Sequence, residues 1–198
     1  MSDQSRLRDT IELPSSYQQH TTVDLKKDRK LTVAVQGIFV LVVLLAAVAA
    51  LLLDLPPATS WPHLVTIPVT LAVCLVYMAV HEVTHGVALQ LLTKMKPSYA
   101  VRFPFLTTGN HAFLTRRSAV IVALAPAAIW GIVLVVALFT LPSDYLLSAY
   151  ILLTLNFAGS AGDFVEVYVV SRQQQDALVK DDGNQIHVYV PGNSSAAQ

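Results

Sequence analysis

Four long apolar stretches divide the chain. They run near 31–53, 64–93, 118–141 and 145–171, and short polar segments separate them. A helix of about 20 apolar residues crosses the roughly 30 Å hydrocarbon core of a bilayer, so each stretch is long enough to span it. The pattern therefore predicts an all-α membrane fold, a bundle of four transmembrane helices over residues 31–171.

The polar segments around these spans predict a tail and two hairpins. Residues 1–30 mix serine, glutamine and charged residues, which is typical of a mobile N-terminal tail. Between the second and third spans, β-prone runs on both sides of residues 107–110 (Thr-Thr-Gly-Asn) predict a short β-hairpin loop. Within residues 172–198, the Asp-Asp-Gly-Asn run at 181–184 predicts a C-terminal hairpin followed by a flexible end.

Composition and charge support a multi-pass protein of the cell membrane. Hydrophobic residues make up 54% of the chain and charged residues 13%, against about 25% charged in an average soluble domain. Lysine and arginine occur before the first span, between the second and third, and after the fourth, and the other two loops contain none. The excess of positive charge on cytoplasmic loops predicts that both termini and both hairpins are cytoplasmic. The basic loops are short and the net charge is zero, so the expected partner is the lipid bilayer and not nucleic acid.

Two features concern processing and redox chemistry. Cys74 is the only cysteine and lies in the second span, which excludes a disulfide framework and a cysteine zinc site. The first apolar stretch begins near residue 31 and is too long for the core of a signal peptide, so we expect no cleavable signal.

A His-Glu-x-x-His motif lies inside the second span. His81 and His85 are four residues apart, so on a helix they share a face and can bind one metal ion. Glu82 between them is placed to hold a water molecule on that metal. The plainer alternatives are a chance match and a hydrogen-bonded pair of core histidines. Unused ionisable groups are costly in lipid, which favours the metal site.

A catalytic zinc site needs a third protein ligand, and the fourth span supplies candidates. Asp163 lies at the same expected depth as His81 on a helix that runs in the same direction. Asn156 is seven residues earlier and therefore shares its face. Asp163 is the favoured ligand, and Glu166 and His111 are the alternatives.

Small residues and a proline mark the third and fourth spans. Ala158, Gly159 and Gly162 predict close approach of a neighbouring helix to the fourth span. Pro126 in the third span lacks an N–H group and frees a backbone carbonyl one turn earlier. A simple kink and a cavity lining are both consistent with this proline.

These motifs together resemble a known family. Residues 81–86 (His-Glu-Val-Thr-His-Gly), Ala125-Pro126, and Asn156-x-x-Gly-Ser-x-Gly-Asp163 are similar to motifs of small bacterial membrane proteins classed as putative zincin peptidases. The resemblance covers roughly residues 75–191. More distantly, the layout resembles the site-2 protease superfamily of intramembrane zinc metalloproteases, in which an aspartate two spans after the histidine motif completes the site. The chain departs from that pattern at Phe164, which follows the aspartate.

The resemblance implies a zinc-dependent intramembrane endopeptidase that cleaves membrane-anchored proteins or peptides. One Zn²⁺ ion would be held by His81, His85 and Asp163 and would polarise a water molecule. Glu82 would act as the general base, and Asn156 would help to stabilise the oxyanion. The hairpin between the second and third spans would receive an unwound substrate segment as an added strand.

Two other classes of function fit parts of the pattern. One is a non-proteolytic membrane chaperone or exporter accessory protein with a structural metal, which would not need Glu82 beside its ligands. The other is a zinc or proton transporter, which would carry polar residues along several spans. Only the second and fourth spans do so.

Overall fold

The computed structural model describes residues 8–25, 27–55, 61–102, 105–109, 112–183 and 185–192. The helices are α1 (Arg29–Leu52), α2 (His63–Thr93), α3 (Arg116–Thr140), α4 (Ser143–Gly159) and α5 (Ala161–Ser171). The strands are β1 (Tyr17–Val23), β2 (Ser98–Arg102), β3 (Phe105–Gly109), β4 (Leu114–Thr115), β5 (Leu178–Asp181) and β6 (Ile186–Pro191).

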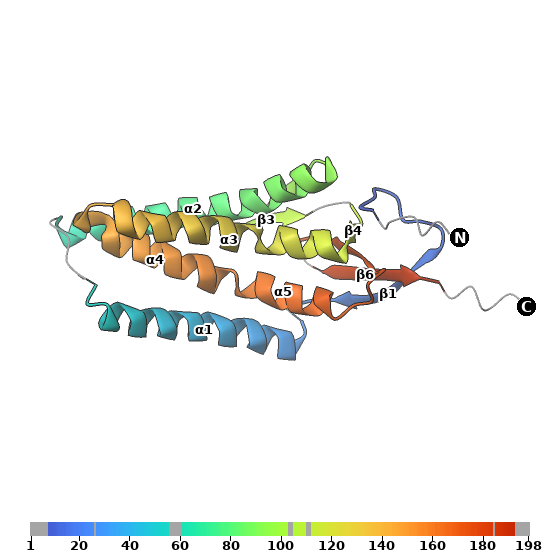
Figure 1. Cartoon of the computed structure of the whole chain (residues 1–198), viewed down its shortest axis with the longest axis horizontal. Helices are drawn as coiled ribbons and strands as arrows, with labels where there is room; N and C mark the ends of the chain where they lie inside the picture. The colour runs from blue at the N-terminus through green and yellow to red at the C-terminus, as the bar shows by residue number, and fades with distance from the viewer. Residues whose placement is uncertain are drawn as a thin grey trace, which may run out of the picture.

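The helices form an elongated bundle with a small sheet at one end (Figure 1). Within the described residues, four helical segments are long and apolar enough to cross a membrane: α1, α2, α3, and α4 with α5 taken together. This confirms the four predicted spans by length and composition and indicates a membrane protein.

Helix α1 is the most peripheral of these segments. It packs against α4 and α5, and none of its residues is buried. Its start is capped by Asp28, whose carboxylate accepts hydrogen bonds from the backbone N–H groups of Lys30 (2.8 Å) and Leu31 (3.3 Å). An outer surface made of valine, leucine and alanine is stable against lipid and would be costly in water.

An antiparallel sheet in the order β1-β6-β5-β4 closes one end of the bundle. Its inner face packs against the ends of α2, α3 and α5. The buried core there includes side chains from helices and strands alike, each at most 1% exposed: Leu89, Val170, Val179 and Val188. The fold is thus mostly helical, with a sheet that joins the predicted C-terminal hairpin to two further segments.

One of these segments is the predicted tail, which is not mobile over Tyr17–Val23. These residues form β1 and pair with β6, more than 160 residues later in the chain. Upstream of β1, Asp9 accepts hydrogen bonds from the backbone N–H of Thr115 (2.7 Å), the N-cap residue of α3, and from the hydroxyl of Ser118 (2.8 Å), and so links the N-terminal segment to the start of α3. The polar composition of this segment suggested disorder. The strand was missed because its pairing partner, β6, is distant in sequence.

The two hairpins differ in how well they were predicted. Strands β5 and β6 confirm the C-terminal hairpin, with Gly183 in the left-handed region at φ 83°. In the other hairpin, β2 pairs with β3, and Thr107 and Thr108 lie within β3 instead of in the turn. Arg102 pairs with Phe105 at the end of this hairpin, and β4 pairs with β5. The β-branched threonines favour an extended strand over a turn.

The fourth span is not one continuous helix. It breaks at Ser160, whose hydroxyl donates to the carbonyl of Asn156 (2.8 Å). The predicted close approach is wrong at Gly159 and Gly162, because a Cβ at either position would meet no atom within 4 Å, whereas Ala158 is buried at 2% exposure. The close contact involves a glycine of α3 instead: a Cβ on Gly131 would lie 3.0 Å from Phe157.

Gly131 therefore sets the spacing between α3 and α4. We expect Gly131→Leu to destabilise the protein by about 1–3 kcal/mol, because the larger side chain must displace Phe157. The measurement is thermal unfolding in detergent. Gly37→Leu on α1 is the matched control, since a Cβ there meets open space, and equal melting temperatures for the two variants would contradict the assignment.

Candidate metal centre

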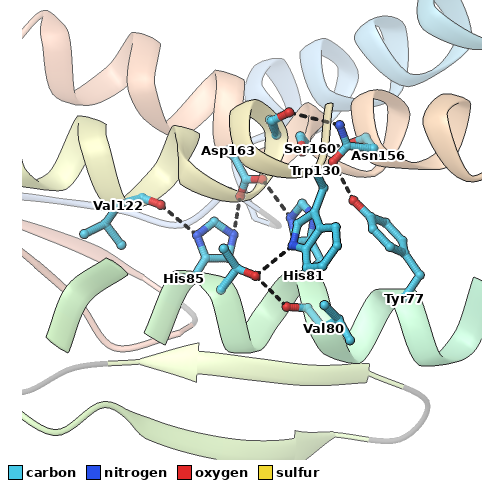
Figure 2. A network of polar contacts seen from close by, with 11 residues as sticks. Tyr77, Val80, His81, His85, Val122, Trp130, Asn156, Ser160 and Asp163 are labelled. Atoms are coloured by element: carbon cyan, nitrogen blue, oxygen red, sulfur yellow. Dashed lines mark hydrogen bonds and ion pairs between the residues drawn. The ribbon is translucent and has the colours of Figure 1, made fainter. Parts of the chain in front are cut away.

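Two histidines of α2 and one aspartate of α5 converge inside the bundle. His81 Nε2 lies 3.4 Å from Asp163 Oδ2, and His85 Nε2 lies 3.5 Å from Asp163 Oδ1. The two imidazole rings are 5.1 Å apart between centroids. Figure 2 shows the three side chains pointing toward one another. The structure thus brings together the three residues that the sequence nominated as metal ligands.

The spacing of these groups fits a zinc ion. Zinc binds histidine nitrogen and carboxylate oxygen at about 2.0–2.2 Å in a tetrahedral arrangement, which places neighbouring donor atoms about 3.3–3.6 Å apart. The two histidine–carboxylate distances fall in this range. All three residues have ligand atoms within 4.8 Å of one another. Three protein ligands leave a fourth position for water or substrate.

The break in the fourth span determines how Asp163 is presented. Helix α5 begins at Ala161, so Asp163 lies in its first turn. The positive end of a helix stabilises a carboxylate there. Ser160 and Ala161 are at most 1% exposed, which fixes the position of the break.

His85 is oriented by a backbone carbonyl of α3. Its Nδ1 donates a hydrogen bond to the carbonyl oxygen of Val122 at 2.9 Å. With the proton on Nδ1, the lone pair of Nε2 is free to bind a metal. His81 is 9% exposed and is held differently, by an edge-to-face contact with the ring of Tyr77 at 6.1 Å.

A buried polar chain ties α2, α3 and α4 together beside the histidines. The Tyr77 hydroxyl donates to Asn156 Oδ1 (2.5 Å), and Asn156 Nδ2 donates to the carbonyl of Ala127 (3.0 Å). Asn156 is 0% exposed. Sequence reasoning named Asn156 but missed these contacts to α2 and α3. The available signal was Tyr77, which lies one turn before His81 on the same face of α2. The oxyanion role of Asn156 stays a prediction.

A second link joins α3 to the motif itself. The Trp130 indole donates to the hydroxyl of Thr84 (2.9 Å), and that hydroxyl donates to the carbonyl of Val80 (2.8 Å). Thr84 occupies the last variable position of the His-Glu-x-x-His motif. This contact fixes the rotation of α2 against α3, and with it the direction of both histidines (Figure 2).

Glu82 lies on the face of α2 that is turned toward the β2–β3 hairpin. Gly86 is four residues after Glu82 and therefore shares its face. A Cβ on Gly86 would overlap the hydroxyl of Tyr99 in β2, so the glycine allows this strand to lie against the helix. Figure 2 shows both strands running alongside α2, and β3 also packs against it.

The alternative third ligands do not join this group. Within the described residues, the set of metal-binding side chains with converging donor atoms consists of His81, His85 and Asp163, and Glu166 is not a member. His111 lies outside the residues that the structure describes.

The sheet adds an acidic group near the centre that the sequence did not suggest. Burial raises the pKa of the Asp181 carboxyl, at the end of β5, to about 6. The hydrogen bond from the Gly183 backbone N–H (2.8 Å) and the charge of His85 lower this pKa, whereas the charges of Asp182 and Asp163 raise it. Asp181 thus lies outside the membrane-spanning helices but close enough to His85 and Asp163 for their charges to affect its pKa.

Comparison with known families agrees with this geometry. The family model described as "Putative zincin peptidase" matches residues 74–178, which is more than half of the chain. The chain belongs to this family. The match contains both histidines and the aspartate, and membership supports a zinc-dependent metallopeptidase. No curated protein and no solved structure matches the chain.

We expect the wild-type protein to bind about one equivalent of zinc and the His81→Ala, His85→Ala double variant to lose it, because two of three ligands are removed. Metal content of the purified protein measures this. His63→Ala is the control, since His63 begins α2 about 27 Å from His81 by the helical rise. Full zinc retention in the double variant would reject the site.

Proposed function

We propose that the protein is a zinc-dependent intramembrane endopeptidase that hydrolyses peptide bonds of membrane-anchored proteins or peptides. The observation that carries this proposal is the convergence of His81, His85 and Asp163 within helices long and apolar enough to cross a membrane. Ionisable groups at such a depth are expensive unless they serve a site. Membership of the peptidase family supports the same reaction class.

The residues of the chain divide the chemistry between them. His81, His85 and Asp163 would hold the metal, and zinc, when bound, supplies Lewis-acid activation of a water molecule. Glu82 accepts a proton from the attacking water and transfers it to the leaving amine. Asn156 is proposed to stabilise the oxyanion, with its side chain held by Tyr77 and Ala127.

The β2–β3 hairpin is the proposed binding surface for substrate. A transmembrane substrate is helical and must unwind before its backbone can be cleaved. The hairpin forms a two-stranded sheet, so within the described residues each strand has one edge without a partner strand. An extended peptide can pair with such an edge. The hairpin contacts α2, and Tyr99 of β2 lies against Gly86, one turn after Glu82, which favours delivery of the peptide to the general base.

A structural metal in a chaperone or exporter accessory protein is the competing proposal. It requires the three ligands but gives no role to a carboxylate beside them. A matched pair of substitutions separates the two.

Glu82→Gln should retain zinc and the fold, because it keeps the shape of the side chain and removes only the base. Turnover of a single-span peptide should fall by about 10²–10⁴-fold. Asp163→Asn weakens a ligand instead, so zinc content and turnover should fall together. Parallel assays of metal content and peptide cleavage distinguish these effects. Cleavage by Glu82→Gln at the wild-type rate would rule out the hydrolytic mechanism, and unchanged zinc affinity in Asp163→Asn would move the third ligand elsewhere.

The proposed orientation places the sheet end of the bundle in the cytoplasm, together with both termini. Basic residues flank the ends of all four spans on that side: Arg29, Lys30, Lys94, Arg116, Arg117 and Arg172. Because basic residues favour the cytoplasmic side, the metal centre would open toward the cytoplasm.

Cysteine labelling in intact cells tests this orientation. In a Cys74→Ala background, Ser143→Cys at the start of α4 should react with an impermeant reagent from outside. Gln175→Cys, between α5 and the sheet, should react only after the cells are opened. Both positions are exposed. The reverse pattern would place the sheet outside the cell.

A further inference from the structure

The proposed chemistry gives no role to Pro126 of α3. It lies in the middle of the helix and is less than 2% exposed. A proline has no N–H, so the carbonyl four residues earlier, that of Val122, loses its helical donor. The proline ring also clashes with that carbonyl and tilts it away from the helix axis.

The released carbonyl is the one that His85 uses. His85 Nδ1 donates to the Val122 oxygen at 2.9 Å, from a helix 37 residues earlier in the chain. An uninterrupted helix would direct this oxygen along its axis toward the N–H of residue 126. The missing donor and the tilted carbonyl therefore both favour the hydrogen bond from His85 to Val122. This bond uses Nδ1 of His85 and leaves its Nε2 facing Asp163.

We propose that Pro126 is a positioning residue for the metal centre: it reserves the Val122 carbonyl for His85 and so sets the tautomer and ring direction of this ligand. The inference rests on the proposed metal site and adds a residue on a third helix that touches neither metal nor substrate. Histidine ligands depend on such partners, whose loss typically weakens metal binding by 10–100-fold.

The test substitutes Pro126→Ala, which restores an N–H at this position. A carbonyl has two lone pairs, so the His85 bond should be weakened by competition and not abolished. Full-length protein in detergent is stripped with a chelator and titrated with Co²⁺. We expect the affinity of Pro126→Ala for Co²⁺ to fall about tenfold, at the lower end of the range for such partners. The absorption spectrum of the Co²⁺ complex should change as well.

Pro68→Ala is the matched control. Pro68 is also inside a transmembrane helix, but it is exposed and precedes His81 by 13 residues. It should leave Co²⁺ affinity and spectrum unchanged. Unfolding temperatures of both variants separate ligand positioning from general loss of structure.

A second readout needs no metal. In metal-free protein labelled with ¹⁵N-histidine, the Nδ1 proton of His85, assigned with His85→Ala, should be protected from exchange. Pro126→Ala should speed its exchange, and Pro68→Ala should not. Wild-type affinity, spectrum and exchange in Pro126→Ala would overturn the inference. If wild-type protein binds no Co²⁺ at this site, the proposed function fails, and the exchange measurement alone then supports or overturns the link from Pro126 to His85.

Discussion

The contact between two histidines and one aspartate is the interaction on which the architecture of the bundle depends. Three ionisable side chains lie among helices with largely apolar surfaces, where each would be costly alone. The pairing requires α2 and α5 to approach at one depth and one rotation. The neighbouring contacts Tyr77–Asn156 and Thr84–Trp130 hold α3 and α4 in the positions that this approach demands. The polar groups of the bundle thus hold one another across α2, α3, α4 and α5.

Backbone irregularities cluster at the same depth, and each exposes a polar group that the centre uses. The break at Ser160 makes Asp163 a first-turn residue of α5, where the helix dipole favours its charge. The proline of α3 exposes the carbonyl that accepts from His85. Irregular backbone in a membrane is tolerated where protein groups satisfy the freed donors and acceptors. In this bundle the partner of the freed carbonyl is a candidate metal ligand.

Sequence reasoning found the parts of the structure that local rules determine. The four spans follow from length and composition, and the histidine pair follows from helical periodicity. Asp163 followed from depth, because helices that start on one side of a membrane advance by a fixed rise per residue. The role of Tyr17–Val23 as a strand could not be predicted, because its partner β6 is distant and its own residues are polar. The turn near 107–110 was misplaced because a Thr-Thr-Gly-Asn run carries turn signals and strand signals at once. The glycines of the fourth span suggested helix packing, whereas the glycine that lies close to a neighbouring helix is Gly131 of α3, which sequence alone does not distinguish from Gly37.

The region matched by the family model contains the residues of the metal centre but not all of the segments that support them. Residues 74–178 contain the motif, Pro126 and Asp163, whereas β1, α1 and β6 lie outside them. Yet β6 occupies a central place in the sheet, and its Val188 is 0% exposed beneath the helix ends. The N-terminal segment also reaches the start of α3, where Asp9 accepts hydrogen bonds from Thr115 and Ser118. The two ends of the chain thus stabilise, from outside the matched region, the helix that presents the carbonyl to His85. A family segment isolated from these ends would keep every residue of the centre and lose the contacts of Asp9 and β6 at the start of α3.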